Sequence, residues 1–219
     1  MVPVALVQQA QRRCFERWGC PQVVRVDNGY PWGTSSGLPT VYGLWLAGLG
    51  VQMRWNEPYR PEQNGVIESS QGVTQRWVDP KTCAHIEELR RRVEQEDYVQ
   101  RECYPAIDGM SRRQAFPGLL HSGRGYCLSW EKLVWDLGEA MRLLGNYQVR
   151  RKVSKRGQVS AYHRLIQVGQ PYGENWVYLR MDPEKVEWVI SDVQGKEIRR
   201  RPAPQFTAEA IVGLSVAQR

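Results

Sequence analysis

The sequence predicts a mixed α/β core followed by a small module made only of short strands. Two observations indicate the core. Apolar residues recur at helical spacing over residues 4–18, and a β-branched run at 23–26 follows soon after Gly19 and Pro21. A third observation predicts the strand module: beyond Gly145, the apolar residues shift from helical spacing toward a period of two residues. A helix followed by a short strand is typical of a parallel sheet covered by helices.

The remainder of the core continues this alternation of helices and strands. After the first strand we expect a connecting loop rich in glycine and hydroxyl side chains at 30–37, a helix at 38–49, a strand at 51–55, helices at 62–78 and 84–103, and a short helical tail at 111–117. These elements place the core within residues 1–120.

The last part of the chain predicts a linker helix and a small barrel. Apolar residues at helical spacing favour one helix at 128–144, within a linker assigned to residues 121–144. Short alternating runs separated by Gly and Pro then predict strands at 147–149, 158–162, 164–168, 176–180, 187–190 and 197–199. Six strands in so few residues favour a β-barrel at 145–202. Residues 203–219 form a tail with a closing helix at 208–214.

Composition indicates a soluble globular protein. Of 219 residues, 42% are hydrophobic and 24% are charged, and no apolar run approaches the roughly 18 residues that cross a bilayer. The start of the chain lacks the pattern of a signal peptide, so we expect a cytoplasmic protein without membrane contact. The five cysteines show no C-x-x-C spacing and the three histidines are far apart, which favours reduced thiols over disulfides or zinc.

Positive charge gathers in the predicted barrel. The chain carries a net charge of +7, and residues 145–202 hold twelve Lys and Arg against six Asp and Glu. A basic module beside a nearly neutral one is typical of a polyanion-binding appendage. A basic surface that serves only solubility is the alternative. The densest group of cations is Arg150, Arg151, Lys152, Lys155 and Arg156.

Two acids stand at the ends of predicted elements. Asp27 begins an Asp-Asn-Gly sequence directly after the first strand, and Glu68 lies about one turn into a helix that follows Asn64 and Gly65. Two carboxylates on rigid supports suit a divalent cation that prefers oxygen ligands. An ordinary turn for Asp27 and a solvated helix face for Glu68 are the alternatives.

Three segments resemble the catalytic core of the integrase and transposase family over about residues 4–120. They are Asp27-Asn28-Gly29, Gly50-Val51, and the run Tyr-Arg-Pro-Glu-Gln-Asn-Gly-Val-Ile-Glu that ends at Glu68. The resemblance implies a ribonuclease-H-like fold and a triad of two aspartates and one glutamate, in which Asp27 is the second acid and Glu68 the last. It also implies DNA strand cleavage and transfer with two Mg²⁺ or Mn²⁺ ions held by these acids.

The chain departs from the family pattern before Asp27. In the family, the first aspartate sits on a strand upstream of the first predicted helix, whereas here no Asp precedes Asp27 and the only earlier acid is Glu16, within that helix. We therefore expect a core that lacks its first strands and its first metal ligand. Such a chain is expected to be inactive in DNA cleavage by itself.

The basic module resembles the C-terminal, SH3-like barrel of bacterial transposases related to that of bacteriophage Mu. The resemblance implies DNA as the partner, both element ends and target, with a homo-oligomer assembled on it and accessory transposition proteins as further partners. It also implies a prokaryotic, nucleoid-associated location. The residues expected to contact DNA are Arg60, Asn64, Arg76, Arg150, Arg151, Lys152, Lys155 and Arg156.

Three functions remain open at this point. The first is a piece of a transposase or integrase that acts within the complete enzyme. The second is a non-catalytic DNA-binding or assembly protein derived from a transposase. The third is an unproductive remnant of a decayed transposable element.

Overall fold

The computed structural model describes residues 2–57 and 60–216, which form two compact units. The sheet unit comprises the described residues of 1–55 and 124–219, and the helical unit comprises those of 56–123. The sheet unit therefore contains both the first and the last part of the sequence. Its boundaries at 55 and 123 differ from the expected ones at 120, 144 and 202.

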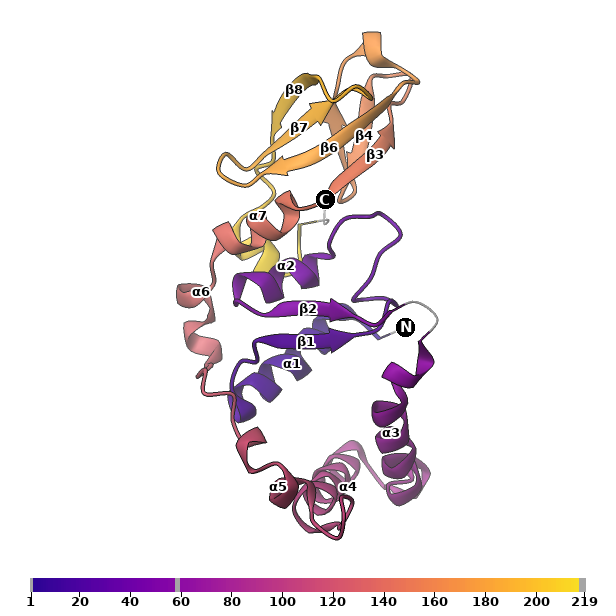
Figure 1. The fold of residues 1–219 in the computed structure, drawn as a ribbon, viewed down its shortest axis with the longest axis vertical. Coiled ribbons are helices and arrows are strands. Elements are labelled where there is room, and N and C mark those ends of the chain that lie inside the picture. The colour runs from indigo at the N-terminus through magenta and orange to yellow at the C-terminus, as the bar shows by residue number, and fades with distance from the viewer. Residues whose placement is uncertain (1, 58–59, 217–219) are drawn as a thin grey trace. The chain divides into compact units, whose positions relative to one another are not determined.

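The first half of the sheet unit has the expected alternation of helices and strands. The elements are α1 (Val4–Trp18), β1 (Val23–Val26), α2 (Val41–Gly48) and β2 (Gln52–Trp55). Strands β1 and β2 pair in parallel, with Val23 opposite Gln52 and Val26 opposite Trp55, and lie side by side in Figure 1. Helix α1 ends at Gly19, whose φ of 78° is accessible to glycine at little cost. The α/β class of the prediction is confirmed.

Helix α2 is the centre of the apolar core of the sheet unit. Its side chains are buried on nearly every side, with Leu44, Trp45 and Leu46 fully enclosed, as expected for a helix without a polar face. It begins later than the predicted residue 38 because the Thr40 side chain caps it by accepting a hydrogen bond from the Gly43 amide at 3.0 Å. The helix therefore holds the loop before it against a rigid core.

The prediction of a single linker helix at 128–144 is wrong. The segment forms a 3-10 turn (Leu128–Trp130), helix α6 (Glu131–Val134) and helix α7 (Leu137–Gly145). Trp135 is extended, with ψ of 125°, and its indole N–H donates to the Trp45 carbonyl at 2.9 Å. Asp136 then caps α7 by accepting from the Gly138 and Glu139 amides. Contacts with α2, far away in sequence, break the helix that local periodicity predicts.

The close approach of Trp135 to α2 depends on Gly48. A Cβ atom at position 48 would lie 2.1 Å from the Trp135 ring, so a side chain there forces the ring or the helix to move. We expect Gly48→Ala to lower the free energy of unfolding by about 1–3 kcal/mol, the usual cost of overpacking. Denaturant unfolding measures this. Gly125→Ala, where nothing lies within 4 Å, is the control, and equal losses in both variants would contradict the packing argument.

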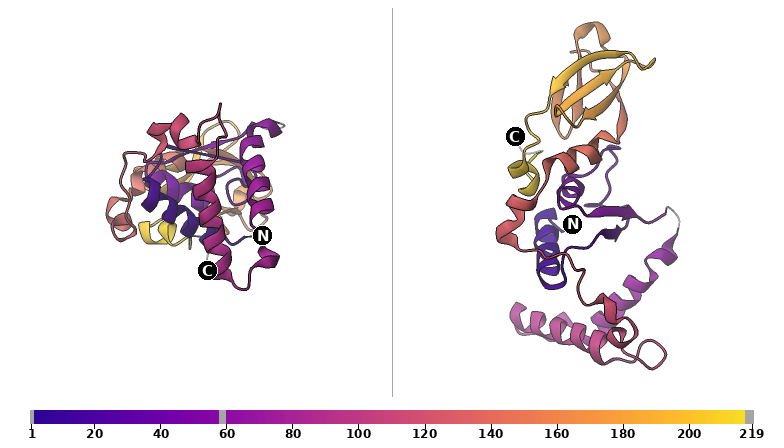
Figure 2. Two further views of the ribbon diagram at one scale, coloured as in Figure 1. Left: turned by 90° about the horizontal axis from the view of Figure 1, so that it is seen from below. Right: turned by 60° about the vertical axis from the view of Figure 1, so that its left-hand side comes forward.

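All six predicted strands of the basic module are present, but the predicted closed barrel is not formed by the described strands. They are β3 (Gln148–Lys152), β4 (Gln158–Ala161), β5 (Arg164–Gln167), β6 (Trp176–Asp182), β7 (Glu187–Ser191) and β8 (Glu197–Pro202). They make an antiparallel sheet in the order β3-β6-β7-β8 and a separate β4-β5 hairpin. Figure 1 and the right-hand view of Figure 2 show this module. Helix α8 (Ala208–Val212) follows at the predicted position.

The helical unit contains two main helices. It consists of a 3-10 turn (Pro61–Gln63), α3 (Gly65–Trp77), a 3-10 turn (Pro80–Thr82), α4 (Ile86–Tyr98) continued by a π turn (Val99–Cys103), α5 (Arg112–Ala115) and a 3-10 turn (Pro117–Leu119). Polar side chains join α3 to α4, because the Thr74 hydroxyl donates to the buried Glu96 carboxylate at 3.0 Å. Arg112 then donates to the Gln100 carbonyl at 2.7 Å.

Two further features concern the whole described chain. All five cysteines are free thiols. Among the described residues, no helix combines the length and the apolar character needed to cross a bilayer.

Candidate functional site

Asp27 lies where the sequence places it, directly after β1. Its carboxylate is exposed, and Oδ1 accepts a hydrogen bond from the Gly29 amide at 3.1 Å. This is the local turn that Asp-Asn-Gly favours. Since β1 and β2 are parallel, both strands end at the same edge of the pair, which is the edge where α/β sheets commonly bind ligands. The turn therefore fixes the acid, and Oδ2 has no hydrogen-bond partner among the described residues.

Glu68 also lies where the sequence places it, in the first turn of α3, with an exposed side chain. It belongs to the helical unit, whereas Asp27 belongs to the sheet unit. Pro58 and Tyr59, which belong to the same motif, lie outside the described residues. The earlier acid Glu16 accepts a hydrogen bond from the Leu128 amide at 3.2 Å, so it has a structural contact within the sheet unit.

The described carboxylates do not make a complete site for two cations. In the part of the chain that the structure describes, no three His, Cys, Asp or Glu side chains gather closely enough to hold a metal ion. Phosphoryl transfer by two metals requires carboxylates that hold both ions a short distance apart. Asp27 and Glu68 are two of the carboxylates that such an arrangement needs, and they belong to different units.

The predicted DNA-binding residues of the helical unit have different surroundings. Arg60 forms surface ion pairs with Glu57 at 3.5 Å and Glu62 at 3.3 Å, which offset its charge. Asn64 precedes α3 and accepts a hydrogen bond from the Asn56 side chain. Arg76 is exposed in the last turn of α3. It is the better placed of the two arginines for a phosphate contact, because no carboxylate among the described residues pairs with it.

The predicted basic cluster of the sheet unit is divided by the alternation of β3. Arg150 and Lys152 point to one side of the sheet and are exposed, whereas Arg151 points to the other side. Lys155 and Arg156 are exposed in the turn between β3 and β4. None of these five cations forms an ion pair with a carboxylate among the described residues, so their charges are available to an anionic partner.

Arg151 borders a cavity that the sequence alone does not reveal. The cavity has a volume of about 920 Å³ and begins beside Asn28, the residue after Asp27. The loop between β1 and α2 forms one wall and the β4-β5 turn, with Tyr162 and His163, forms another. The Tyr162 hydroxyl donates to the Pro39 carbonyl at 2.6 Å and so fastens the turn to the loop. Figure 1 shows this loop reaching the β module.

The walls of the cavity are rich in hydrogen-bond donors. The hydroxyl oxygens of Thr34, Ser36 and Thr40 each accept a hydrogen bond from a backbone amide at 3.0–3.2 Å, and within the described residues none of the three O–H groups has an acceptor. The Arg151 guanidinium is held by the carbonyls of Ser36, Arg150 and Ser160, and no lining residue is Asp or Glu. Such a cavity suits a ligand that only accepts hydrogen bonds, such as a phosphodiester.

The loop owes its shape to Gly33. A Cβ atom there would lie 2.3 Å from the Asn28 carbonyl oxygen, so only glycine permits the loop to fold back on the segment after Asp27. The glycine and hydroxyl content of residues 30–37 is the one signal in the sequence that points to this wall. The opposite wall, more than a hundred residues later, has no such signal.

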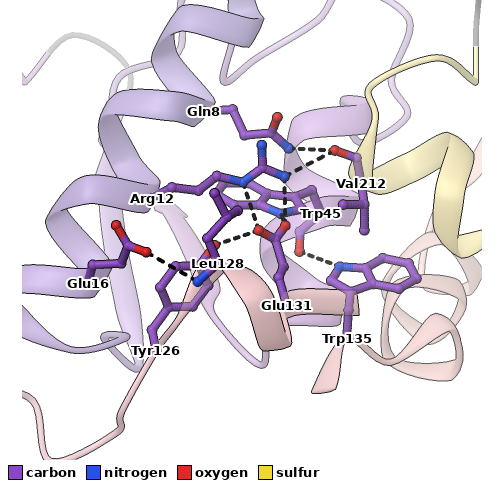
Figure 3. A network of polar contacts seen from close by, with 9 residues as sticks. All are labelled: Gln8, Arg12, Glu16, Trp45, Tyr126, Leu128, Glu131, Trp135 and Val212. Carbon is purple, nitrogen blue, oxygen red and sulfur yellow. Dashed lines mark hydrogen bonds and ion pairs between the residues drawn. The ribbon is translucent and has the colours of Figure 1, made fainter. Parts of the chain in front are cut away.

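A second polar cluster lies in the core of the sheet unit and is structural (Figure 3). Glu131 is 1% exposed and accepts hydrogen bonds from Arg12 at 2.7 and 2.8 Å, from the Trp45 indole at 2.6 Å and from the Tyr126 hydroxyl. Burial alone would raise the pKa of Glu131, but these donors outweigh it and lower the pKa. Because both carboxylate oxygens are occupied, this acid joins α1, α2 and α6 and has no free oxygen for a substrate.

Comparison of the sequence with models of known protein families gives no match.

Proposed function

We propose that this chain binds DNA as part of a transposase or integrase of the class with two aspartates and one glutamate. In this proposal, the parallel strands β1 and β2 belong to a ribonuclease-H-like core, and the β3–β8 module is related to SH3-like barrels. Asp27 and Glu68 are two of the acidic metal ligands. The motif around Glu68 and the Asp-Asn-Gly sequence after β1 support this assignment of the two acids.

The observation that carries the proposal is the cavity beside Asn28. It offers the Arg151 guanidinium and the hydroxyls of Thr34, Ser36 and Thr40 to a ligand, and its lining contains no carboxylate. A phosphodiester backbone matches this chemistry, because its oxygens accept hydrogen bonds and carry negative charge. A DNA strand that follows the cavity would pass next to the turn that holds Asp27.

The two acids contribute to the chemistry only when their ligand set is complete. Bound Mg²⁺ or Mn²⁺ would supply charge stabilisation to the attacking and leaving oxygens of the phosphodiester. The turn at Gly29 orients the Asp27 carboxylate, and α3 carries Glu68 on a rigid support. A third acid from another chain or segment is required before the site can hold both ions.

A non-catalytic DNA-binding protein is the second candidate. The absence of a three-ligand metal group among the described residues favours it. Both candidates place DNA on the same surface, and they differ only in whether a further acid completes the site.

One assay tests DNA binding and catalysis together. We expect the purified chain to bind a 30-bp duplex with an affinity that falls steeply between 50 and 200 mM salt, as phosphate contacts dictate. With Mg²⁺ or Mn²⁺ in the same mixtures, we expect no strand cleavage or transfer, and Asp27→Asn should leave binding unchanged.

Two outcomes would contradict these expectations. Binding that is absent at 50 mM salt would refute DNA as the partner. Efficient cleavage that Asp27→Asn abolishes would show that the site is complete in this chain, contrary to the ligand count.

A further inference from the structure

One face of the four-stranded sheet combines aromatic rings with cations. Its members at the β3–β6 pair, which we call the outer face, are Gln148, Arg150, Lys152, Trp176, Tyr178 and Arg180. The register places Arg150 opposite Tyr178 and Lys152 opposite Trp176, so these side chains project from the same side of the sheet. Residues between them, such as Val177 and Leu179, are fully buried on the other side. The outer face is therefore the exposed side of a packed sheet.

Trp176 is an exposed tryptophan on the outer face. The Trp176 side chain is 44% exposed, and the Arg150 guanidinium lies over its ring, with Cζ 4.5 Å from the ring centroid. The two residues are diagonal neighbours across the strands, which is a common geometry for long side chains on a sheet. The guanidinium and the indole ring therefore form a small stack of two flat groups.

The charge of the outer face is positive and unopposed. Within the described residues, Arg150, Lys152 and Arg180 form no ion pair with a carboxylate. The acids farther along the same sheet contact Arg200 instead, with Asp182 at 2.6 Å, Glu197 at 2.9 Å and Glu187 at 4.0 Å. An anionic ligand with aromatic groups matches this combination of rings and free cations.

We propose that the outer face binds single-stranded DNA, with an unpaired base stacked on the Trp176–Arg150 pair and the backbone held by Lys152 and Arg180. This inference rests on the proposed function, because it adds single-stranded DNA to the duplex DNA that the β module is proposed to contact. Many proteins bind unpaired bases through aromatic side chains that lie beside cations on an open sheet. A duplex cannot use the tryptophan in this way, because its bases are already stacked and paired.

The spacing of the two aromatic residues on β6 also favours a DNA strand whose bases are not stacked on one another. Trp176 and Tyr178 are two residues apart on β6, which separates them by about 6.6 Å. Bases in a duplex strand follow each other at about 3.4 Å, so one base on each ring requires a strand that is extended and splayed. Single-stranded DNA adopts such a path without loss of base pairing.

The test separates the contribution of the bases to the affinity from that of the phosphates. We would measure the affinity of the chain for a twelve-nucleotide thymidine strand and for a strand of twelve abasic nucleotides, which has the same phosphates and no bases. We expect the thymidine strand to bind about 5- to 150-fold more tightly, the range that base stacking on an aromatic side chain provides. Equal affinity for the two strands in the wild-type protein would overturn the proposal without any variant.

Three variants locate the effect. Trp176→Ala should remove the preference for bases and leave the salt dependence unchanged, since no charge is lost. Trp130→Ala is the matched control, because Trp130 is 61% exposed elsewhere in the sheet unit. Lys152→Ala should reduce the salt slope by about 0.7 for both strands and keep the preference. A preference that survives Trp176→Ala, or that Trp130→Ala removes equally, would overturn the proposal.

A cross-linking experiment on the wild-type protein covers the case in which Trp176→Ala fails to fold. A thymidine strand with one 5-iodouracil should cross-link to Trp176 or Tyr178 of β6, and cross-links found only outside the outer face would overturn the proposal. Binding of duplex DNA distinguishes a failure of this inference from a failure of the proposed function. If duplex binding is normal and the base preference is absent, only this inference fails; if duplex binding is also absent, the proposed function fails.

Discussion

Replacing Glu131 by glutamine is expected to lower the free energy of unfolding by about 3 kcal/mol, near the lower end of the range for breaking a buried ion pair. The side chain is 1% exposed, and three donor residues, Arg12, Trp45 and Tyr126, surround it. Glutamine removes the charge that faces Arg12. It also turns one acceptor oxygen into an NH₂ group, which leaves at least one buried donor without an acceptor.

The network extends beyond the carboxylate, which increases the expected loss. Arg12 and Gln8 of α1 also donate to the Val212 carbonyl of α8, at 3.4 and 3.0 Å (Figure 3). A displaced Arg12 therefore weakens the contact of α1 with both α6 and α8. Denaturant unfolding followed by circular dichroism measures the loss. Glu139→Gln, an exposed acid on α7 paired only at the surface, is the control and should change stability by less than about 0.5 kcal/mol.

The pH dependence gives this prediction a second readout. Because the donors hold the pKa of Glu131 below its unfolded value, its charge stabilises the fold fully above the unfolded pKa. That contribution disappears as the pH falls through the lower, folded pKa. The wild type should therefore lose its advantage over Glu131→Gln in acid. An equal difference at neutral pH and well below the folded pKa would show that the charge of Glu131 does not stabilise the fold.

Tyr126 makes the stability of the same network depend on alkaline pH. Burial, and then the neighbouring Glu131 carboxylate, raise the pKa of its hydroxyl above the ordinary value. The protonated hydroxyl stabilises the folded state fully below the unfolded pKa of about 10. This contribution is lost as the pH rises from there toward the folded pKa, so the network is most stable between the acid and alkaline limits.

Local sequence patterns predicted the elements of this protein well because the deciding interactions are local. The run from Val4 to Trp18 has helical spacing and ends at Gly19, and β1 follows where β-branched residues cluster. Gly or Pro lies in the turns that bound the six short strands and limits their lengths, except at the β4–β5 turn, which Tyr162 and His163 form. Asp27 and Glu68 were placed correctly on their elements for the same reason, whereas their joint role in metal binding stays a prediction.

Long-range contacts explain what sequence patterns missed. The helix expected at 128–144 is interrupted because Trp135 packs on Gly48, and no periodicity within the segment encodes that contact. Glu131 resembles any solvated acid in the sequence, yet its partners Arg12 and Trp45 lie 119 and 86 residues away. The cavity likewise needs the loop after Asp27 and a turn near Tyr162, which only the fold brings together.

Removing the unpaired cations of the β module should have the largest effect on DNA binding. In the first variant, Arg150, Lys152, Lys155 and Arg156 become alanine, while Arg151 is kept because it holds the loop at Ser36. Each phosphate contact contributes about 0.9 to the salt slope for duplex DNA, so we expect the slope to fall by about three to four. Over a fourfold change in salt, the wild type should then lose roughly a hundredfold more affinity than the variant.

A matched variant separates local contacts from net charge. Arg90, Arg92, Arg113 and Arg142 each pair with a carboxylate at the surface, and replacing all four by alanine changes the net charge by the same amount. If the exposed cations of the β module contact the phosphates, this second variant keeps a slope near that of the wild type. Equal losses of slope in both variants would mean that overall charge alone attracts DNA. In that case, the exposed cations of the β module would have no specific place in the binding of DNA.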